Sequence, residues 1–283
     1  MQYFCFVLNP DGGVANILNE SLLGFYSKLY RCEDCKGIKN PRGVHHFING
    51  RGIPSSSGYL PPTIPVSHFG DIVNSKIWVV TTNPKGDRSD PLVGLNVQKF
   101  GVNSRTYLTE SDIQSIFETQ CNYFRSSKER WHRFFLPFVQ LLDGLRLGKQ
   151  NLSFLSGDVC FVDAIKCPTT IAWQGFVRSD DGKQVWNSCL RVKNQFLREQ
   201  LKIHKPKSVL YYGTGSLVKV KHKGRKVEES IRFSNNLKLQ TRYLYSNNDL
   251  ERISVEFSKA NLNLLESELG EVRDFITKSF ASC

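Results

Sequence analysis

The sequence predicts a single α/β domain of three layers, in which helices cover both faces of a mainly parallel central sheet. Buried apolar runs alternate with amphipathic helical segments along the chain, which is the pattern of such folds. A chain of 283 residues is also long enough to bury one large hydrophobic core. Because no internal repeat or low-complexity tail divides the sequence, we expect residues 1–283 to form one domain.

Four short apolar runs are the predicted strands of this sheet. They lie at residues 76–82, 158–165, 208–213 and 239–246. In an open α/β sheet, the loops that follow the carboxyl ends of the strands usually carry the chemistry. The polar loop after the first strand, which begins NPKGDRSDPLVG at residue 83, is therefore the first candidate for a functional site.

Helical segments separate the predicted strands. They are residues 14–31, 109–126, 128–145, 187–205 and 258–280. The second of these begins with Thr109-Glu-Ser-Asp112, in which the threonine and the aspartate form the pattern of a capping box. Between the first helix and the first strand, residues 36–75 are rich in Gly, Pro and Ser and are predicted to be a long irregular loop. A loop of this length is usually functional or tied down.

Four cysteines are candidates for such a tether. Cys32 and Cys35 form a CxxC before the long loop, Cys167 directly follows the second strand, and Cys189 lies in the next helix. Four thiolates can hold a zinc ion or a [4Fe–4S] cluster. In a cytosolic chain, where thiols stay reduced, a metal site explains such cysteines better than disulfides do.

The formal net charge of +12 favours a polyanionic partner, most often a nucleic acid. Basic residues crowd a predicted hairpin at 217–233, where Lys221, Lys223 and Arg225 suit contacts to DNA phosphates, although a solvated hairpin is the alternative. No apolar run approaches the roughly 18–20 residues of a membrane span, and the N-terminus lacks the basic region of a signal peptide. We therefore expect a cytoplasmic, nucleoid-associated monomer that binds DNA.

With these residues in view, the chain resembles the uracil-DNA glycosylase superfamily, and most of all its iron–sulfur branch, families 4 and 5. The branch carries a CxxC, a Lys-Cys pair after the second strand and a further cysteine in the next helix. The matching residues here are Cys32, Cys35, Lys166, Cys167 and Cys189. Its first motif, GExPG…PFVG, resembles residues 81–86 and 90–94. The resemblance runs from about residue 20 to the C-terminus, and implies a DNA glycosylase whose four cysteines hold a [4Fe–4S] cluster, or alternatively zinc.

Asn83 precedes the proline of the first motif, as in the mismatch-specific thymine/uracil enzymes, whereas the classical uracil enzymes have Asp there. The resemblance implies that Asn83 positions the attacking water. An amide can orient water but cannot take its proton, so we expect slow turnover or a base that leaves easily. Cleavage of the N-glycosidic bond passes through an oxocarbenium-like state, which tolerates a weak base. The structural alternative is a turn residue before proline.

The predicted base-binding residues depart from the superfamily pattern. Asp163 stands where many members have an Asn that reads uracil, and an ionised carboxylate only accepts hydrogen bonds, which suits the amino group of cytosine. Leu92 replaces the Phe that stacks on the base, Lys85 replaces a Tyr that bars substituents at C5, and Thr82 replaces the branch's Glu. These changes predict a 5-substituted cytosine as the substrate. A purely structural Asp163, capping the next loop or pairing with Lys166, is the alternative.

The last superfamily motif follows the final strand, and here it reads Tyr-Ser-Asn-Asn at 245–248, without its usual histidine. Ser246 and Asn247 are expected to clamp the DNA backbone there. The predicted function is a monofunctional DNA glycosylase that leaves an abasic site, with an antiviral role if the base is a hypermodified phage base. The alternatives are a repair enzyme for uracil or a deaminated base, and a catalytically silent iron–sulfur relative that binds DNA.

Overall fold

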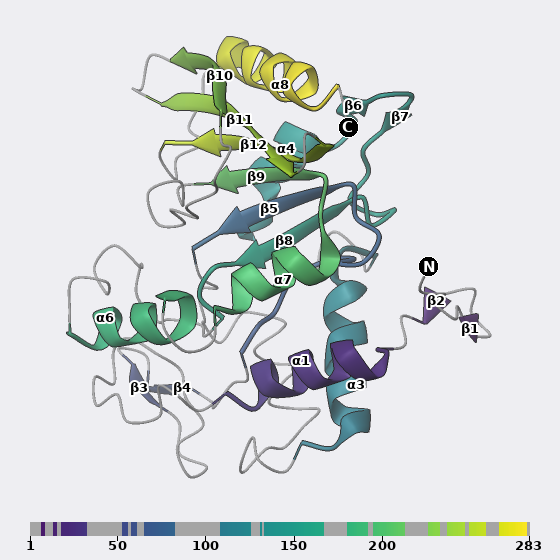
Figure 1. The fold of residues 1–283 in the computed structure, drawn as a ribbon, viewed down its shortest axis with the longest axis vertical. Helices are drawn as coiled ribbons and strands as arrows, with labels where there is room; N and C mark the ends of the chain where they lie inside the picture. The colour runs from purple at the N-terminus through teal and green to yellow at the C-terminus, as the bar shows by residue number, and fades with distance from the viewer. Residues whose placement is uncertain are drawn as a thin grey trace.

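A six-stranded sheet forms the centre of the computed structural model of the chain, in the strand order β10-β11-β12-β9-β5-β8 (Figure 1). The structure describes residues 7–8, 14–15, 18–32, 53–55, 58–60, 65–82, 108–125, 131, 133–166, 180–191, 195–212, 226–232, 237–246, 249–258 and 266–281. The strands of the sheet are β5 (Ile77–Thr81), β8 (Val159–Asp163), β9 (Ser208–Tyr212), β10 (Lys226–Arg232), β11 (Lys238–Ser246) and β12 (Asp249–Phe257).

The direction of these strands makes the sheet mainly parallel. β5 is parallel to both of its neighbours, β8 and β9, and β9 is parallel to β12. β11 is antiparallel to β10 and β12, and it is the one described strand of this sheet that runs against the others. The predicted α/β class with a mainly parallel sheet is therefore confirmed.

Helices cover both faces of the sheet. They are α1 (Glu20–Tyr30), α3 (Glu110–Cys121), α4 (Leu136–Leu142), α7 (Phe196–His204) and α8 (Glu266–Phe280). A further helix, α6 (Asp180–Trp186), leads into the π-helical turn before α7. Because successive side chains of a strand point to opposite faces, Ile77 and Val79 of β5 join one core with α4 and α8, whereas Trp78 and Val80 join a second core with α1, α3 and α7. No helix in the part of the chain that the structure describes is both long and apolar enough to span a membrane.

Smaller elements connect the larger ones. They are the strand pairs β1 (Val7–Leu8) with β2 (Val14–Ala15), β3 (Ile53–Ser55) with β4 (Gly58–Leu60) and β6 (Arg146–Leu147) with β7 (Gln150–Asn151), the 3₁₀ turns Tyr123–Arg125 and Arg133–Phe135, and the π-helical turn Asn187–Arg191. The π turn and α7 divide a stretch that the sequence predicts as one continuous helix. The prediction of one continuous helix was wrong. The spacing of hydrophobic residues does not show where a helix ends or where a π turn replaces it.

The helix starts are explained by local hydrogen bonds. Thr109 caps α3 by accepting from the main-chain N–H of Asp112 at 3.2 Å, and the Asp112 carboxylate accepts from the main-chain N–H of Thr109 at 2.8 Å. The predicted capping box is therefore confirmed. Asn19 caps α1 in a similar way, by accepting from the N–H of Leu22 at 3.0 Å.

The predicted strand at residues 239–246 is confirmed, but it does not belong to the parallel part of the sheet. These residues belong to β11, which pairs antiparallel with β12 from Leu239 and Phe257 to Ser246 and Asp249. The strand that is parallel to β9 and pairs with it is β12, which was not predicted from the sequence. Alternating apolar residues indicate a strand but not its direction, and we had interpreted the polar residues after it as a motif rather than as the end of a hairpin arm.

The segment before β5 packs closely against the sheet at Gly70, and a substitution there tests this packing. The φ of Gly70 is +95°, and an added Cβ would lie 2.6 Å from the carbonyl oxygen of Val159 and 2.8 Å from the Phe124 ring. We expect Gly70→Ala to lower the free energy of unfolding by roughly 2–5 kcal/mol, measured by urea denaturation. Gly24→Ala in α1 is the control: nothing lies within 4 Å of its added Cβ, so it should be neutral or stabilising by up to about 1 kcal/mol. Equal effects of the two changes would contradict this packing.

Candidate functional site

The carboxyl ends of β5 and β8 lie side by side and carry the best-defined polar group of the site. Thr81, the last residue of β5, is the register partner of Asp163, the last residue of β8. Both residues are buried, and the Thr81 hydroxyl donates a hydrogen bond to Asp163 Oδ1. Main-chain bonds continue beyond the strands, from Ala164 N to Thr81 O (2.9 Å) and from Ile165 N to Thr82 O (2.8 Å). The two strand ends are therefore held together up to the residue before Asn83.

Lys166 is buried beneath this edge, with 1% of its surface exposed. Its ammonium donates to the main-chain oxygens of Asp163 and Ser67, the latter at 3.2 Å. Burial lowers the pKa of Lys166 to about 7, against the opposing charges of Asp163, Cys189 and Cys160. Lys166 therefore ties the turn after β8 to the segment before β5, and part of its interaction with Asp163 runs through the main chain.

Residues 65–75 form neither a helix nor a strand, as the predicted irregular loop requires, but the segment is largely buried and makes one isolated bridge to β8. Val66, Phe69 and Ile72 are buried, and Phe69 exchanges two main-chain hydrogen bonds of 2.8 Å with Phe161 of β8. The Gly, Pro and Ser content of the wider region suggested a loop, but composition does not show that a segment pairs with a distant strand. This buried segment brings polar residues to the centre of the molecule.

Ser67 is the meeting point of three helices and the end of β8. Its hydroxyl lies 2.9 Å from the Tyr30 hydroxyl of α1, and Tyr30 donates to Oε1 of Gln120 in α3 at 3.0 Å. The Ser67 carbonyl accepts from Gln200 of α7 at 3.3 Å as well as from Lys166. Gln120 Nε2 and Gln200 Oε1 are buried without a hydrogen-bond partner among the described residues. Such a network fixes the helices around the site. The two unpaired polar atoms cost free energy of folding, so the network is not arranged for stability alone.

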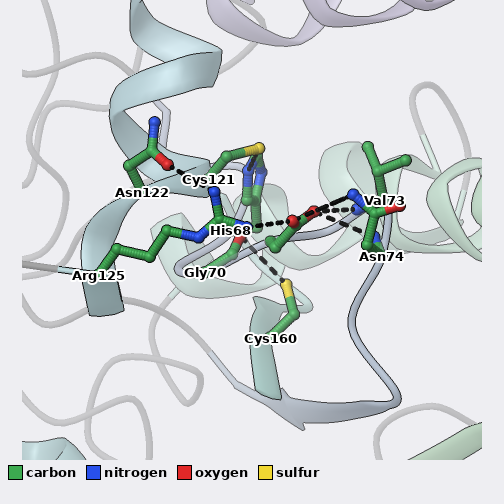
Figure 2. Close-up of polar contacts among 9 residues, drawn as sticks. His68, Gly70, Val73, Asn74, Cys121, Asn122, Arg125 and Cys160 are labelled. Carbon is green, nitrogen blue, oxygen red and sulfur yellow. Dashed lines mark hydrogen bonds and ion pairs between the residues drawn. The ribbon is translucent and has the colours of Figure 1, made fainter. Parts of the chain in front are cut away.

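His68 lies in the same network and contacts a thiol. Its Nδ1 is 2.6 Å from the Ser67 hydroxyl, and its Nε2 is 3.3 Å from Cys121 Sγ; Figure 2 shows the imidazole against this cysteine of α3. Burial lowers the pKa of His68 well below its usual value, helped by the charges of His204 and Lys166. His68 is therefore neutral at pH 7. No sequence motif points to His68, whose partners Ser67 and Cys121 come together only in the fold.

A second polar group surrounds Asp71, and Figure 2 labels its partners Val73, Asn74 and Arg125. The Asp71 carboxylate accepts from the Arg125 guanidinium at 3.0 Å and from the main-chain N–H groups of Val73 and Asn74 at 3.1 and 3.0 Å. An added Cβ at Gly157, just before β8 begins, would lie 3.3 Å from Asp71 Cβ. Asp71 therefore lies toward the amino end of β8, away from Asp163, and serves to fix the turn before β5.

Two of the four predicted metal ligands are described. Cys32 is half-buried directly after α1, and Cys189 is buried in the π turn, where its charge acts on Lys166. Cys35 and Cys167 lie outside the described residues, within which no group of three or more His, Cys, Asp or Glu side chains is placed to hold a metal ion.

The surroundings of these two cysteines fit an anionic cluster. Arg31 precedes Cys32, and its Nε is buried without a partner among the residues that the structure describes. The buried Lys166 acts on Cys189 and precedes Cys167 in the chain. A cluster bound by four thiolates carries negative charge, so buried cations beside its ligands would stabilise it.

The other predicted site residues are less well placed or not described. Those outside the described residues are Asn83, Lys85, Leu92, Lys221, Lys223, Arg225 and Asn247. Thr82 is half-buried beside Ile165. Ser246 ends β11 and pairs with Asp249, where β12 begins. β12 runs in the same direction as β9 and β5, so its first residue, Asp249, lies at the amino ends of the parallel strands. Ser246, which pairs with Asp249, therefore lies at the opposite end of the strands from Asp163. It does not lie beside Asp163, and its contact with the DNA backbone stays a prediction.

Comparisons with other proteins give this chain no relative. No family model, no curated protein and no solved structure matches it. The likeness to uracil-DNA glycosylases therefore stays an expectation from sequence motifs. A fold alone does not determine an activity, so the function has to be inferred from the chemistry of the site.

The buried His204 makes stability depend on pH. The hydroxyl of Tyr26 (Oη) lies 2.8 Å from His204 Nε2, and burial lowers the pKa of His204 from 6.5 to about 4. Between these values the unfolded chain binds a proton that the folded chain does not, so stability should fall as the pH drops from 6.5 to 4. We expect His204 to contribute roughly 1–3 kcal/mol to that loss. Urea unfolding at pH 7.5 and 4.5 should show a smaller loss for His204→Gln than for the wild type, and equal losses would contradict the assignment.

Proposed function

We propose that the chain is a DNA glycosylase that hydrolyses the N-glycosidic bond of a flipped-out 5-substituted cytosine. The observation that supports this most is the buried Asp163 at the carboxyl end of β8, which accepts a hydrogen bond from Thr81. A carboxylate held in this way remains an acceptor for other donors. The 4-amino group of cytosine is a donor, whereas the 4-carbonyl of uracil is an acceptor that the carboxylate would repel.

Asn83 takes the role of orienting the attacking water in this proposal. It follows Thr82, whose carbonyl accepts a hydrogen bond from the main-chain N–H of Ile165, so the water and the base would be handled at the ends of neighbouring strands. The leaving base departs from an oxocarbenium-like sugar, and water then adds at C1′. The products are the free base and an abasic site, and the protein supplies no covalent nucleophile.

The remaining predicted residues would shape the pocket and hold the DNA. Leu92 would pack on the base, and Lys85 would face the substituent at C5 or a phosphate. Extraction of a base from the duplex requires strong contacts to the backbone. The net charge of +12 supports such contacts, with Lys221, Lys223 and Arg225 as the proposed phosphate ligands.

The proposed cofactor is a [4Fe–4S] cluster bound by Cys32, Cys35, Cys167 and Cys189. The cluster would supply a covalent tie between distant parts of the chain, rather than reaction chemistry. Its ligands come from the end of α1, from the turn after β8 and from the π turn before α7. Arg31 and Lys166 would balance its charge. In this role the cluster would hold the long segment between Cys35 and residue 65 against the sheet.

A panel of oligonucleotides tests the activity. Single target bases (uracil, mismatched thymine, cytosine and 5-methyl-, 5-hydroxymethyl- and glucosylated cytosine) are incubated with the protein, and alkali then reveals abasic sites. We expect the 5-substituted cytosines to be excised fastest, because Asp163 accepts from the amino group. Faster excision of uracil would indicate the repair enzyme instead.

Asn83→Ala separates catalysis from binding in the same assay. We expect the excision rate to fall by about 10²-fold or more, because the water loses its orienting group, while the affinity for DNA changes little. Wild-type protein that binds DNA but excises none of these bases would contradict the enzyme and support the silent DNA-binding alternative.

The cluster is tested by colour and by metal content. The purified protein should be brown, absorb near 400 nm, and contain about four iron and four sulfide ions per chain. Cys189→Ser should lose most of the iron. Cys160→Ala, at a buried thiol in β8 whose pKa is raised by burial, is the control and should retain it. A colourless protein that contains one zinc ion would support the zinc alternative, and a protein without bound metal would contradict both.

A further inference from the structure

We propose that Thr81 is a positioning residue that sets the preference of the site for cytosine-type over uracil-type bases. It would do so through Asp163, whose carboxylate it holds as a hydrogen-bond acceptor. This inference rests on the proposed base-binding role of Asp163. No role in recognition follows for Thr81 from the sequence motifs, so its assignment comes from the geometry of the two strand ends.

The contact between Thr81 and Asp163 is fixed by the sheet. The two residues are register partners at the ends of parallel strands, and their exposed fractions are 5% and 4%. The main chain on both sides is held by the bonds from Ala164 to Thr81 and from Ile165 to Thr82. The main chain therefore keeps the two residues opposite each other, within reach of a side-chain hydrogen bond.

The direction of this hydrogen bond gives it a chemical consequence. A threonine hydroxyl has one proton, and here it is donated to Asp163 Oδ1. The bond orients the carboxylate, and Asp163 is the acceptor of the pair. Lys166 donates to the main-chain oxygen of Asp163 and so helps to fix the end of β8. Without the hydroxyl, the carboxylate loses the donor that orients it from β5, and its preference for the amino group of a cytosine-type base should weaken.

Three variants isolate the hydroxyl. Thr81→Val has the same shape but no donor, and Thr81→Ala is a second variant without the hydroxyl in case valine disturbs folding. Thr81→Ser keeps the donor. Thr241→Val is the matched control: Thr241 is fully buried in β11 of the same sheet, and its hydroxyl lies 2.6 Å from that of Ser279, in the core shared with α8. Thermal unfolding confirms that each variant is folded.

The measurement is a ratio of two affinities. Each protein is titrated with two duplexes that differ in one target nucleotide, 5-hydroxymethylcytosine or uracil. Both target nucleotides carry a 2′-fluoro group. The fluorine destabilises the oxocarbenium-like state, so the glycosidic bond resists cleavage during the titration. Cleavage rates on the unfluorinated duplexes give a second ratio. We expect Thr81→Val and Thr81→Ala to lower the preference for the cytosine-type base by about tenfold, the equivalent of one hydrogen bond. Thr81→Ser and Thr241→Val should stay within about threefold of the wild type.

The outcomes distinguish this inference from the proposed function. An unchanged ratio in the hydroxyl-free variants, or an equal change in Thr241→Val, would overturn the role of Thr81 even if the wild type is an active glycosylase. A wild type that shows no preference between the two duplexes would overturn it as well. Conversely, a wild type that binds with a preference but does not cleave would contradict the enzyme, and the affinity ratios of the variants would still decide the role of Thr81.

Discussion

The parallel pairing of β5 with β8 is the interaction on which the rest of the site depends. It brings Thr81 beside Asp163 at the end of both strands, although 82 positions separate them in the chain. The main-chain bonds beyond the strands extend this register as far as Thr82 and Ile165. The base-reading Asp163 of the proposal lies at this carboxyl end of the sheet, where open α/β folds usually bind their ligands, and the proposed water-positioning Asn83 follows Thr82 in the sequence.

The segment around Ser67 supports this edge from one face. Its main chain bonds to Lys166 and Gln200, and its hydroxyl meets Tyr30 and Gln120, so α1, α3 and α7 are fixed relative to the end of β8. The network buries polar atoms, which costs free energy that an apolar core of the same size would not lose. Its value lies in holding one geometry: the same helices that meet at Ser67 also lead to Cys32 and, through the π turn, to Cys189.

Local patterns in the sequence were sufficient for the elements whose causes are local. The capping box at Thr109 and the apolar runs of β5, β8 and β9 are such cases. Asp163 was predicted at the site only through the resemblance, because it stands where many superfamily members have an Asn, and the predicted strand ran past it to residue 165. The direction of β11 depends on its partner and could not be predicted from alternation alone. Ser67 and Gln120 were missed because their partners are distant in the sequence. A signal for Gln120 was present, since it continues the apolar face of α3 after Ile113 and Phe117.

The central claim is that the carboxylate of Asp163 selects the base, and the most direct test compares the wild type with Asp163→Asn. A mixture of two duplexes, one with 5-hydroxymethylcytosine and one with uracil, is treated with each protein, and the free bases released are quantified by mass spectrometry. The wild type should release mainly 5-hydroxymethylcytosine. The variant should shift toward uracil, because its amide can donate to the 4-carbonyl. The same ratio of bases from both proteins, or mainly uracil from the wild type, would contradict the account.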